Sequence, residues 1–406
     1  MLDTARMKHI QIDNYTYDLP EDRIARYPLS NRDKSKLLVN VSGRISEDIF
    51  LNISDYLEPG DTLVFNDSRV VRARLIMNKD SGATIEVFCL EPHHPIDFAR
   101  NFASTGPVRW KCLIGNLKKW KGGKISLKAM MNGKEITIYA ERIEKSGEAW
   151  IVEFDWTNHN LTFSEVLESA GRIPIPPYLN RKDEEIDQQR YQTIYCNTDG
   201  SVAAPTAGLH FTEDVFSKIG MKGILKTAIT LHVSAGTFKP VKAINISDHE
   251  MHTEHFYVTS ETLDLLAKER IIAVGTTTLR TLESIYWIGV SLIEGHFNPA
   301  LGPVTEQWYP YRHHREVSTS EAIEAVRGYI DSHHTGILEA RTSLLIVPGY
   351  RFRLVKGLIT NFHQPRSTLL LLVAAFAGKN WNEMYDYAMK NDFRFLSYGD
   401  SSLIIP

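Results

Sequence analysis

The hydrophobic and polar positions follow two different patterns along this chain of 406 residues. Between residues 69 and 158, short β-rich runs such as ATIEVFCL, KISLKAM and AWIVEFDW are separated by turn pairs, among them Gly122-Gly123 and Asn132-Gly133. Five or more short strands at this spacing are typical of an antiparallel barrel or sandwich. We therefore expect a small antiparallel β-barrel domain over residues 69–158.

The rest of the chain alternates between strand and helix patterns. We expect helices at 162–171, 260–270, 278–289, 320–331 and 367–378, and strands at 60–67, 226–233, 271–275, 343–347 and 358–360. This alternation predicts an α/β fold with a mostly parallel sheet. Because one such strand precedes residue 69, we expect the barrel to be inserted in a discontinuous α/β domain made of residues 1–68 and 159–406.

Composition and charge exclude several classes of protein. The net charge is −3, and the three cysteines form no C-x-x-C pair, so neither a disulfide framework nor a structural zinc site is indicated. The N-terminus has no signal-peptide pattern, and the longest apolar run, 369–377, is far shorter than the about 20 residues that span a membrane. We expect a cytoplasmic protein without a membrane partner.

Basic residues are concentrated in one part of the predicted barrel. Residues 107–145 contain ten Lys or Arg but only three Glu, and the basic residues include Lys118, Lys119 and Lys121. Such a patch attracts phosphates through a salt-dependent interaction that does not depend on base sequence. A solvated lysine-rich face of a β domain explains the same composition equally well.

Small and polar residues gather where predicted strands end, which is where ligands bind in open α/β sheets. The stretch SVAAPTAGLHFT, residues 201–212, has small side chains that let a ligand lie close to the backbone, and its His210 precedes a helix cap at Thr212. The small-residue turn after strand 226–233 allows the same close approach. However, Asn66 and Asp67 are ordinary turn formers, and a lone histidine is more often structural than catalytic.

Two further segments carry more specific chemistry. HEMHTEHF, residues 249–256, would place His249 and His252 on one face of a helix, but the H-E-x-x-H order is missing. Polar site residues or a surface cluster are therefore favoured there over a metal site. In VGTTTLRTLES, residues 274–284, a strand ends at Gly275 and a helix follows, whose free N–H groups favour a phosphate or carboxylate. The segment is neither a P-loop nor a dinucleotide-binding motif.

Together these segments resemble one known family. FNDSRVVRARL, RYQTIY, VAAPTAGLHFT, LHVSAGTFKPV, HEMHTEHF, VGTTTLRTLES, TNFHQPRSTLLLLVAAFAG and FRFLSYGD look like the S-adenosylmethionine:tRNA ribosyltransferase-isomerase family of queuosine biosynthesis, in family order from about residue 19 to 402. The resemblance implies an α/β domain interrupted by a small β-barrel. It also implies transfer and isomerisation of the ribosyl part of S-adenosylmethionine onto 7-aminomethyl-7-deazaguanine at the tRNA wobble position. The products would be epoxyqueuosine-tRNA, adenine and methionine.

The resemblance also implies which residues form the site. Groups that suit proton transfer near neutral pH are the catalytic candidates His210, His232, His252, Glu254 and His363. The substrate-binding candidates are Asn66, Asp67, Arg69, Pro205, Thr206, Ala207, Gly208, Phe211, Ser234, Gly236, Thr237, Gly275, Thr276, Thr277, Thr278, Arg280, Asn361, Phe362, Arg366, Ser367, Tyr398 and Asp400. Lys118, Lys119 and Lys121 would contact tRNA phosphates. We expect S-adenosylmethionine as a co-substrate, tRNA as the partner, no metal, and a monomer.

The chain departs from the family pattern at several positions. Ser234 stands where the family usually has Gly, Arg72 where it has Pro, and Gln364-Pro-Arg where it has Leu-Pro-Lys. Residues 288–341 contain apparent extra material. These departures keep two alternatives open. One is a divergent or inactive paralogue that binds RNA or S-adenosylmethionine, and the other is an enzyme that acts on another nucleoside.

Overall fold

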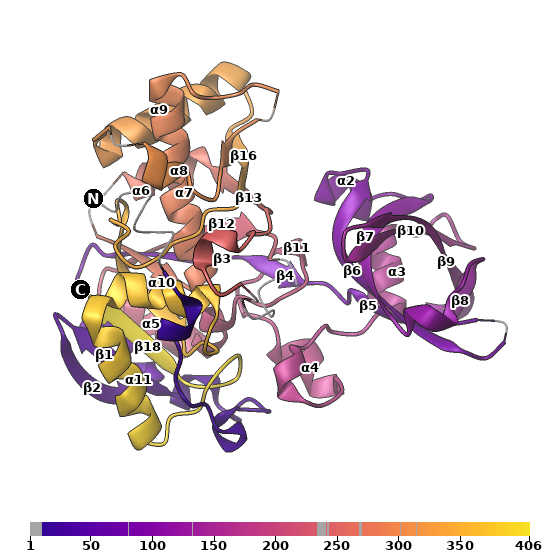
Figure 1. The fold of residues 1–406 in the computed structure, drawn as a ribbon, viewed down its shortest axis with the longest axis horizontal. Helices are drawn as coiled ribbons and strands as arrows, with labels where there is room; N and C mark the ends of the chain where they lie inside the picture. The colour runs from indigo at the N-terminus through magenta and orange to yellow at the C-terminus, as the bar shows by residue number, and fades with distance from the viewer. Residues whose placement is uncertain are drawn as a thin grey trace.

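The computed structural model describes residues 10–406 except 80, 132, 234–240, 242, 268–269, 301 and 314. It has two parts, which lie side by side in Figure 1. One is built on a ten-stranded sheet, and the other is a closed barrel of six strands. We call them the sheet body and the barrel. The predicted α/β fold with an inserted antiparallel barrel is confirmed.

The sheet body has a parallel centre and mixed edges. Its strand order is β15-β16-β13-β12-β3-β14-β17-β18-β1-β2, and the central strands β12, β3, β14 and β17 pair in parallel. Strands β3 and β14 are buried along their whole length, as expected for strands covered on both faces. The strands are β1 Lys36–Val41, β2 Arg44–Ile49, β3 Thr62–Asn66, β12 Leu225–Leu231, β13 Glu254–Thr259, β14 Ile271–Val274, β15 Val304–Thr305, β16 Ile337–Thr342, β17 Val355–Asn361 and β18 Ser401–Ile405.

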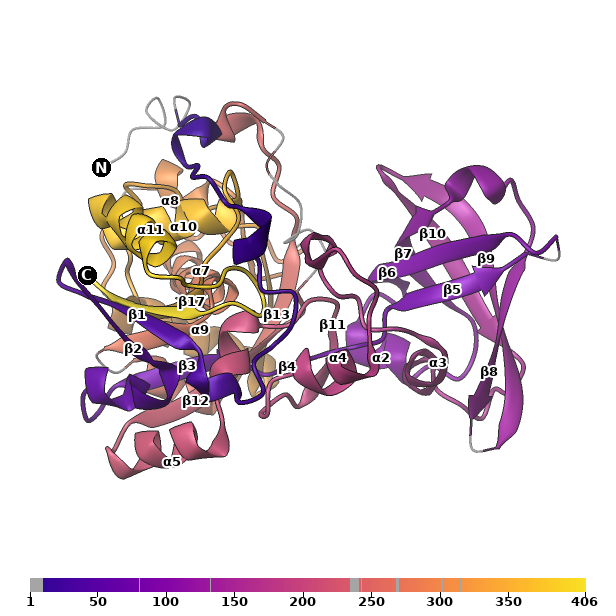
Figure 2. The same cartoon turned by 90° about the horizontal axis from the view of Figure 1, so that it is seen from below.

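Helices cover both faces of this sheet. Helix α5 and a 3-10 helix, Phe50–Tyr56, pack on one face, whereas α6, α7, α9, α10 and α11 pack on the other. Figure 2 shows α5 on the side opposite α10 and α11. The helices are α4 Glu185–Arg190, α5 Glu213–Met221, α6 Ser260–Leu266, α7 Thr276–Glu294, α8 Tyr309–Arg312, α9 Thr319–His333, α10 Thr368–Ala377 and α11 Trp381–Lys390.

The barrel is closed by antiparallel pairs in the order β10-β7-β6-β5-β8-β9. Its core contains Trp110 and Phe154, and α3, Phe163–Ala170, begins with a capping box of Thr162 and Glu165 at the predicted cap. The parallel pair β4, Ser68–Val70, and β11, Thr198–Ser201, lies between the barrel and the sheet body (Figure 2). The other barrel elements are β5 Arg74–Asn78, β6 Thr84–His94, α2 Phe98–Phe102, β7 Val108–Gly115, β8 Ile125–Met131, β9 Lys134–Ser146 and β10 Ala149–Trp156.

Local structure differs from what the sequence patterns suggest at three places. The expected strand 343–347 is irregular: its apolar side chains are buried, and the N–H groups of Ser343 and Leu345 donate to the carbonyls of Thr305 and Gln307. The strand of that region is β16, just before it. Residues 249–256 are not helical, since a 3-10 helix ends at Asp248 and β13 begins at Glu254. Within the expected loop 201–212, residues Thr206–His210 form a 3-10 helix.

Candidate active-site pocket

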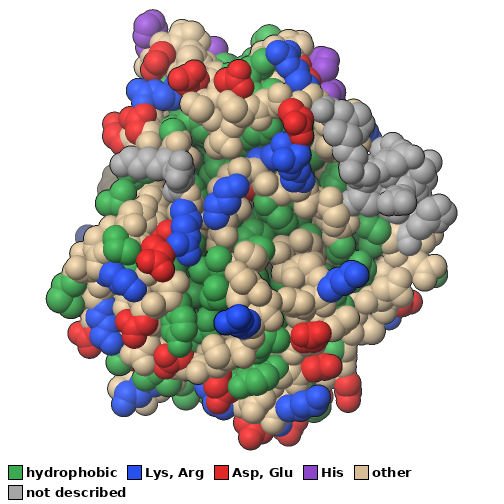
Figure 3. Space-filling model, turned by 90° about the vertical axis from the view of Figure 1, so that its left-hand side faces the viewer, with side chains coloured by type: hydrophobic (Ala, Val, Ile, Leu, Met, Phe, Trp, Pro, Cys, Tyr) green, Lys and Arg blue, Asp and Glu red, His purple; other side chains and the backbone are tan. Residues whose placement is uncertain are grey.

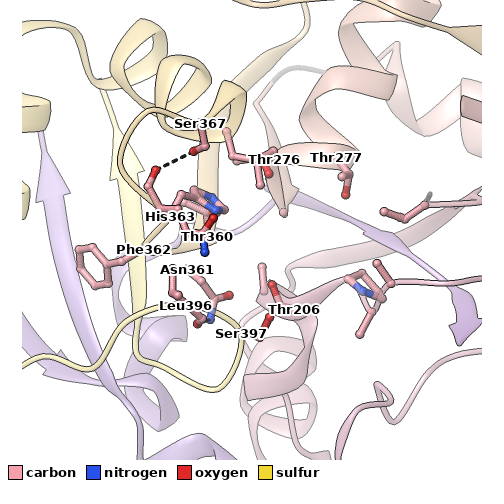
Figure 4. Close-up of a pocket in the computed structure, with 18 of the residues that line it drawn as sticks. Thr206, Thr276, Thr277, Thr360, Asn361, Phe362, His363, Ser367, Leu396 and Ser397 are labelled. Atoms are coloured by element: carbon pink, nitrogen blue, oxygen red, sulfur yellow. Dashed lines mark hydrogen bonds between the residues drawn. The ribbon is translucent and has the colours of Figure 1, made fainter. Parts of the chain in front are cut away.

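A pocket lies at the carboxyl ends of the central parallel strands (Figure 4). Strands β14 and β17 end at Val274 and Asn361, and residues at and after both ends line the pocket. Because carboxyl ends of parallel strands meet at one edge of a sheet, segments far apart in the sequence converge here. The lining residues are Tyr178, Ala203, Ala204, Pro205, Thr206, Ala207, Val233, Gly275, Thr276, Thr277, Thr360, Asn361, Phe362, His363, Gln364, Ser367, Leu369, Leu396 and Ser397.

The N-terminus of α7 opens onto this pocket. Its N-cap is Gly275, whose φ of 99° suits glycine, and no side chain caps the helix. Thr276 and Thr277, the first two helical residues, line the pocket. In contrast, α10 is capped by Ser367, whose Oγ accepts from the Leu370 N–H at 3.1 Å. The first-turn N–H groups and the dipole of α7 therefore favour an anionic group in the pocket.

His363 lines the pocket, and no other histidine among the described residues does so. Its Nε2 lies 2.9 Å from Oγ1 of Thr360, and its backbone N–H donates to Oη of Tyr385 at 3.0 Å. These contacts hold the ring at the end of β17. Burial lowers the pKa of His363 to about 3. The imidazole is therefore neutral near pH 7, and burial makes its protonated form unfavourable in the free protein.

His210 lies behind the pocket wall, in a smaller neighbouring cavity. Its Nδ1 is 2.7 Å from Oγ of Ser35, and its Nε2 is 3.2 Å from Nδ2 of Asn361, which lines the main pocket. If the amide donates to Nε2, the Nδ1–H donates to Ser35 and the ring is neutral. Burial, together with the Arg394 charge, lowers the pKa of His210 to about 3. His210 is thus placed to orient Asn361.

His232 joins the sheet body to the barrel. Its ring stacks on Phe98 of α2, with ring centroids 4.1 Å apart, and meets the Tyr257 ring edge-on. Gly200 is needed beside it, because a Cβ at that position would overlap the imidazole. Burial lowers the pKa of His232 to about 3. The ring is buried and does not line the pocket, so the structure gives it a packing role.

Two further catalytic candidates form a buried charge network with Arg280. Nε2 of His252 lies 3.1 Å from Oε1 of Glu254, and the guanidinium of Arg280 pairs with the same carboxylate. Glu254 and Arg280 are almost fully buried and do not line the pocket. We expected Arg280 to bind the methionine carboxylate or a phosphate. Its charge is instead compensated inside the protein, as a buried guanidinium requires.

The structure brings one group of predicted residues together and leaves others outside the pocket. Those that line it are Pro205, Thr206, Ala207, Gly275, Thr276, Thr277, Asn361, Phe362, His363 and Ser367. Those that do not line it are Asn66, Asp67, Arg69, Gly208, His210, Phe211, His232, His252, Glu254, Thr278, Arg280, Arg366, Tyr398 and Asp400. Ser234, Gly236 and Thr237 lie outside the described residues.

Structural roles account for several residues of the second group. The side-chain amide of Asn66 bonds both the N–H and the carbonyl of Leu231 at 3.0 Å, which ties β3 to β12. Tyr398 donates to Oδ1 of Asp187 at 2.8 Å. Gly208 was expected to let a ligand approach, but a Cβ there would overlap the Tyr195 hydroxyl. Asn66 and Tyr398 thus hydrogen-bond to other groups of the protein, and Gly208 leaves space for the Tyr195 hydroxyl. None of the three lines the pocket.

Sequence reasoning missed part of the pocket wall. Tyr178 comes from the proline-rich run 172–181, and its Oη is 2.5 Å from Oγ of Ser397, which lines the pocket beside Leu396. Ser397 belongs to the SYGD turn, from which only Tyr398 and Asp400 were selected. Gln364, one of the departures from the family pattern, also lines the pocket, whereas Arg72 bonds to Glu168 at the foot of the barrel. A proline-rich run gives no periodic signal, so Tyr178 could not be found from the pattern.

Some basic residues of the barrel are paired, and others are exposed. Arg109, Lys111 and Lys128 pair with glutamates across the barrel strands. The cluster of Lys118, Lys119 and Lys121 is exposed, in and next to the 3-10 turn that follows β7. Among the described residues, no helix is long and apolar enough to cross a membrane.

Comparison with known proteins identifies the family. A family model described as "Queuosine biosynthesis protein" matches residues 12–404. An S-adenosylmethionine:tRNA ribosyltransferase-isomerase of Trichlorobacter lovleyi is 37% identical over 403 residues, covering 97% of this chain and 99% of that protein. One of Halothermothrix orenii is 38% identical over 406 residues, covering 98% and 100%. A crystal structure of an S-adenosylmethionine tRNA ribosyltransferase from Thermotoga maritima is 29% identical and covers 96% of this chain and 99% of that one, with a TM-score of 0.45. This chain belongs to the queuosine biosynthesis protein family.

Proposed function

We propose that this protein transfers and isomerises the ribosyl group of S-adenosylmethionine onto 7-aminomethyl-7-deazaguanine at the wobble position of tRNA. The products are epoxyqueuosine-tRNA, adenine and methionine. The observation that carries the proposal is the similarity, over almost the whole chain, to proteins named S-adenosylmethionine:tRNA ribosyltransferase-isomerase. The strand-end pocket supports it, because it combines an anion site with small residues and a histidine.

The pocket offers a place for each part of S-adenosylmethionine. The methionine carboxylate binds at the uncapped N-terminus of α7, where Thr276 and Thr277 line the pocket. The short side chains of Ala203, Ala204 and Ala207 leave room for a flat base against the backbone. The ribosyl group then lies between these two subsites.

We assign proton transfer in the pocket to His363. The sulfonium of S-adenosylmethionine makes the adjacent ribose C–H more acidic, and the neutral imidazole has the lone pair needed to take that proton. Because burial lowers the pKa of His363 in the free protein, this role requires that the anionic groups of the bound substrates stabilise the protonated ring. Oγ1 of Thr360, 2.9 Å from Nε2, holds the ring in place. His210 acts as a positioning residue, because it contacts the substrate side of the pocket only through Asn361.

The two parts of the molecule have separate tasks in this proposal. Residues 1–68 and 159–406 form the catalytic domain, and residues 69–158 form a domain that contacts tRNA. The exposed Lys118, Lys119 and Lys121 support this division, because exposed charges are free to meet phosphates. The wobble base is splayed from the anticodon loop into the pocket, as in most recognition of single-stranded RNA. The protein acts as a monomer in the cytoplasm, where its tRNA substrate is.

Ribose-labelled S-adenosylmethionine tests the proposal. The protein is incubated with it and with tRNA that carries the aminomethyl base, and the tRNA is digested to nucleosides for mass spectrometry. The modified nucleoside should contain the labelled ribosyl carbons. His363→Ala should slow transfer by about 100-fold or more while S-adenosylmethionine still binds. His159→Ala, at an exposed position between β10 and α3, is the matched control. Binding of S-adenosylmethionine without label transfer in the wild type would instead identify an inactive paralogue.

A further inference from the structure

Three side chains of types that commonly bind metal ions lie together at the C-terminal end of α7. Nδ1 of His296 and Nδ1 of His313 both lie 3.2 Å from the same carboxylate oxygen, Oε2 of Glu294. One ligand atom from each residue lies within 4.8 Å of the other two. Among the residues that the structure describes, no other group of three or more His, Cys, Asp or Glu side chains meets in this way.

Local backbone geometry builds this cluster. Helix α7 ends at Glu294, and Gly295 follows in the left-handed conformation, at φ 70°. This C-cap turns the chain back, so that the His296 N–H donates to the Ser291 carbonyl at 3.0 Å and the imidazole lies beside Glu294. His313 is the C-cap of α8 and comes from a different segment. Ligands from two elements therefore meet at one point.

Tyr309 fixes the orientation of two of the three side chains. Its ring stacks on His313, with centroids 4.0 Å apart, and its hydroxyl donates to Oε2 of Glu294 at 3.4 Å. Glu294 is mostly buried, with 12% of its side chain exposed, whereas His296 is 52% exposed. A buried carboxylate and an open outer side suit an ion that enters from solvent. Residues that hold metal ligands by a second hydrogen bond or contact are common around protein metal sites.

The two histidine–carboxylate separations match one divalent metal ion, and the third pair of ligand atoms lies within 4.8 Å. Zinc binds histidine nitrogen and carboxylate oxygen at about 2.0–2.2 Å, so two ligands of a tetrahedral zinc lie about 3.4 Å apart. The two Nδ1–Oε2 separations of 3.2 Å are close to that value. Two histidines and one carboxylate also form a ligand set known for zinc, with a fourth position left for water.

We propose that Glu294, His296 and His313 bind a divalent transition-metal ion, zinc in the first instance. Both histidines are neutral ligands through Nδ1, and the Glu294 carboxylate supplies the negative charge. The ion links the end of α7 to the end of α8 within residues 288–341, the segment that departs from the family pattern. The sequence did not indicate His296 and His313 as possible metal ligands, because they are 17 positions apart and share no motif.

The site is separate from the substrate pocket. The N-terminus of α7 lines that pocket, and Glu294 ends the same helix of 19 residues, which places the two about 28 Å apart at 1.5 Å per residue. The ion therefore stabilises the segment and takes no part in ribosyl transfer. Loss of the metal should leave the activity intact.

Zinc titration of the full-length protein, first stripped with a chelator, tests the proposal. Competition with a chromogenic chelator should show one zinc ion per chain, and the His296→Ala/His313→Ala variant should bind at least about 100-fold more weakly. Bound Co²⁺ should give the visible absorption bands of a four-coordinate ion in the wild type only. The matched control is His333→Ala/His334→Ala, which removes two exposed histidines at the end of α9.

Each outcome decides the proposal. Zinc binding that is lost in the first double variant and kept in the control supports it. No zinc binding by the wild type, or equal weakening in both double variants, overturns it. Circular dichroism of the variants excludes loss of folding as the cause of weak binding. Ribosyl transfer by the His296→Ala/His313→Ala variant, measured separately, keeps this test independent of the proposed function.

Discussion

Three histidines, the buried His210 and His232 and the partly buried His363, couple the stability of this protein to pH. Burial lowers the pKa of each to about 3, whereas an unfolded histidine has a pKa of about 6.5. Below pH 6.5 the unfolded chain therefore binds protons that the folded protein does not bind. The contribution of these histidines to the free energy of unfolding is therefore complete above pH 6.5 and is lost as the pH falls toward 3.

Replacement of one of these histidines should reduce the slope. His232→Asn removes a titrating group away from the pocket, so the free energy of unfolding should fall less steeply between pH 6 and 4.5, by up to about 1.4 kcal/mol per pH unit. Urea unfolding at a series of pH values measures this slope. His93→Asn, which removes an exposed histidine of β6, is the matched control for the loss of a buried one. An unchanged slope in His232→Asn would mean that His232 is protonated in the folded protein.

At the scale of single residues, the sequence predicted the pocket unevenly. Residues directly after β14 and β17, such as Gly275 and Asn361, were found because strand ends in an α/β sheet have a known place. Arg280 and Glu254 do not line the pocket and instead pair with each other, since a polar residue near such a strand end serves equally well in a buried ion pair. Which of the two roles applies depends on side-chain direction and burial, and neither can be read from residue type.

Among the helices, the open N-terminus of α7 is the feature most specific to substrate binding. Thr277→Asp places a carboxylate in the first turn, where it should compete with the methionine carboxylate and raise the KM for S-adenosylmethionine about 10-fold or more. The same charge interacts favourably with the helix dipole, so thermal stability should stay the same or rise slightly. Steady-state kinetics and thermal unfolding measure the two effects.

The control for this change is Ser320→Asp. Ser320 occupies the same second position of α9, whose N-terminus is capped by Ser318 and does not line the pocket. The KM of the Ser320→Asp variant for S-adenosylmethionine should match that of the wild type. A KM for Thr277→Asp that also matches the wild type would show that the carboxylate binds elsewhere.

The contact between α7 and α9 depends on one glycine. A Cβ on Gly289 would overlap the backbone carbonyl of Ala322, so Gly289→Ala should destabilise the protein by about 1–3 kcal/mol. Gly328→Ala is the matched control, because nothing lies within 4 Å of its Cβ position in α9. There alanine should be neutral or stabilise the helix by up to about 1 kcal/mol. Chemical denaturation of both variants compares them, and equal stabilities would contradict the close approach of the two helices.

Elements with strong periodicity were predicted well, and elements that depend on distant partners were not. Helix α9 follows a 3.6-residue pattern, with Ala322, Ile323, Val326 and Ile330 buried, and α7, α9 and α10 all lie close to the expected ranges. Strand β16 was missed in favour of the more apolar run 343–347, because hydrophobicity reports burial and not hydrogen bonding. Pairing with β13 decides which of the two is a strand, and that partner lies about 80 positions away.

For the whole molecule, charge distribution separates the two parts. Figure 3 shows the side of the sheet body that faces away from the barrel, and there Lys and Arg are interspersed with Asp and Glu. The barrel instead has an exposed lysine cluster, Lys118, Lys119 and Lys121, next to strands whose charges are paired. Such a basic cluster on the barrel suits a tRNA that is held there while its anticodon loop reaches the pocket.

Salt dependence of tRNA binding tests this role. Lys118→Ala/Lys119→Ala/Lys121→Ala should weaken binding and make the plot of log K against log salt concentration shallower by about 2–3 units, because each lost phosphate contact removes about 0.7–0.9. Lys128→Ala is the matched control, since Lys128 already pairs with Glu135 at 2.8 Å. A triple variant with the affinity and slope of the wild type would remove the barrel from the tRNA interface.

Adenine release tests the central claim most directly. The protein is mixed with S-adenosylmethionine and one of three partners, namely tRNA with the aminomethyl-deazaguanine base, the same tRNA with guanine, or the free modified base. Adenine and methionine should appear together, one of each per tRNA, with the first partner only. The claim is contradicted if the modified tRNA binds but no adenine is released, or if the free base supports the same rate.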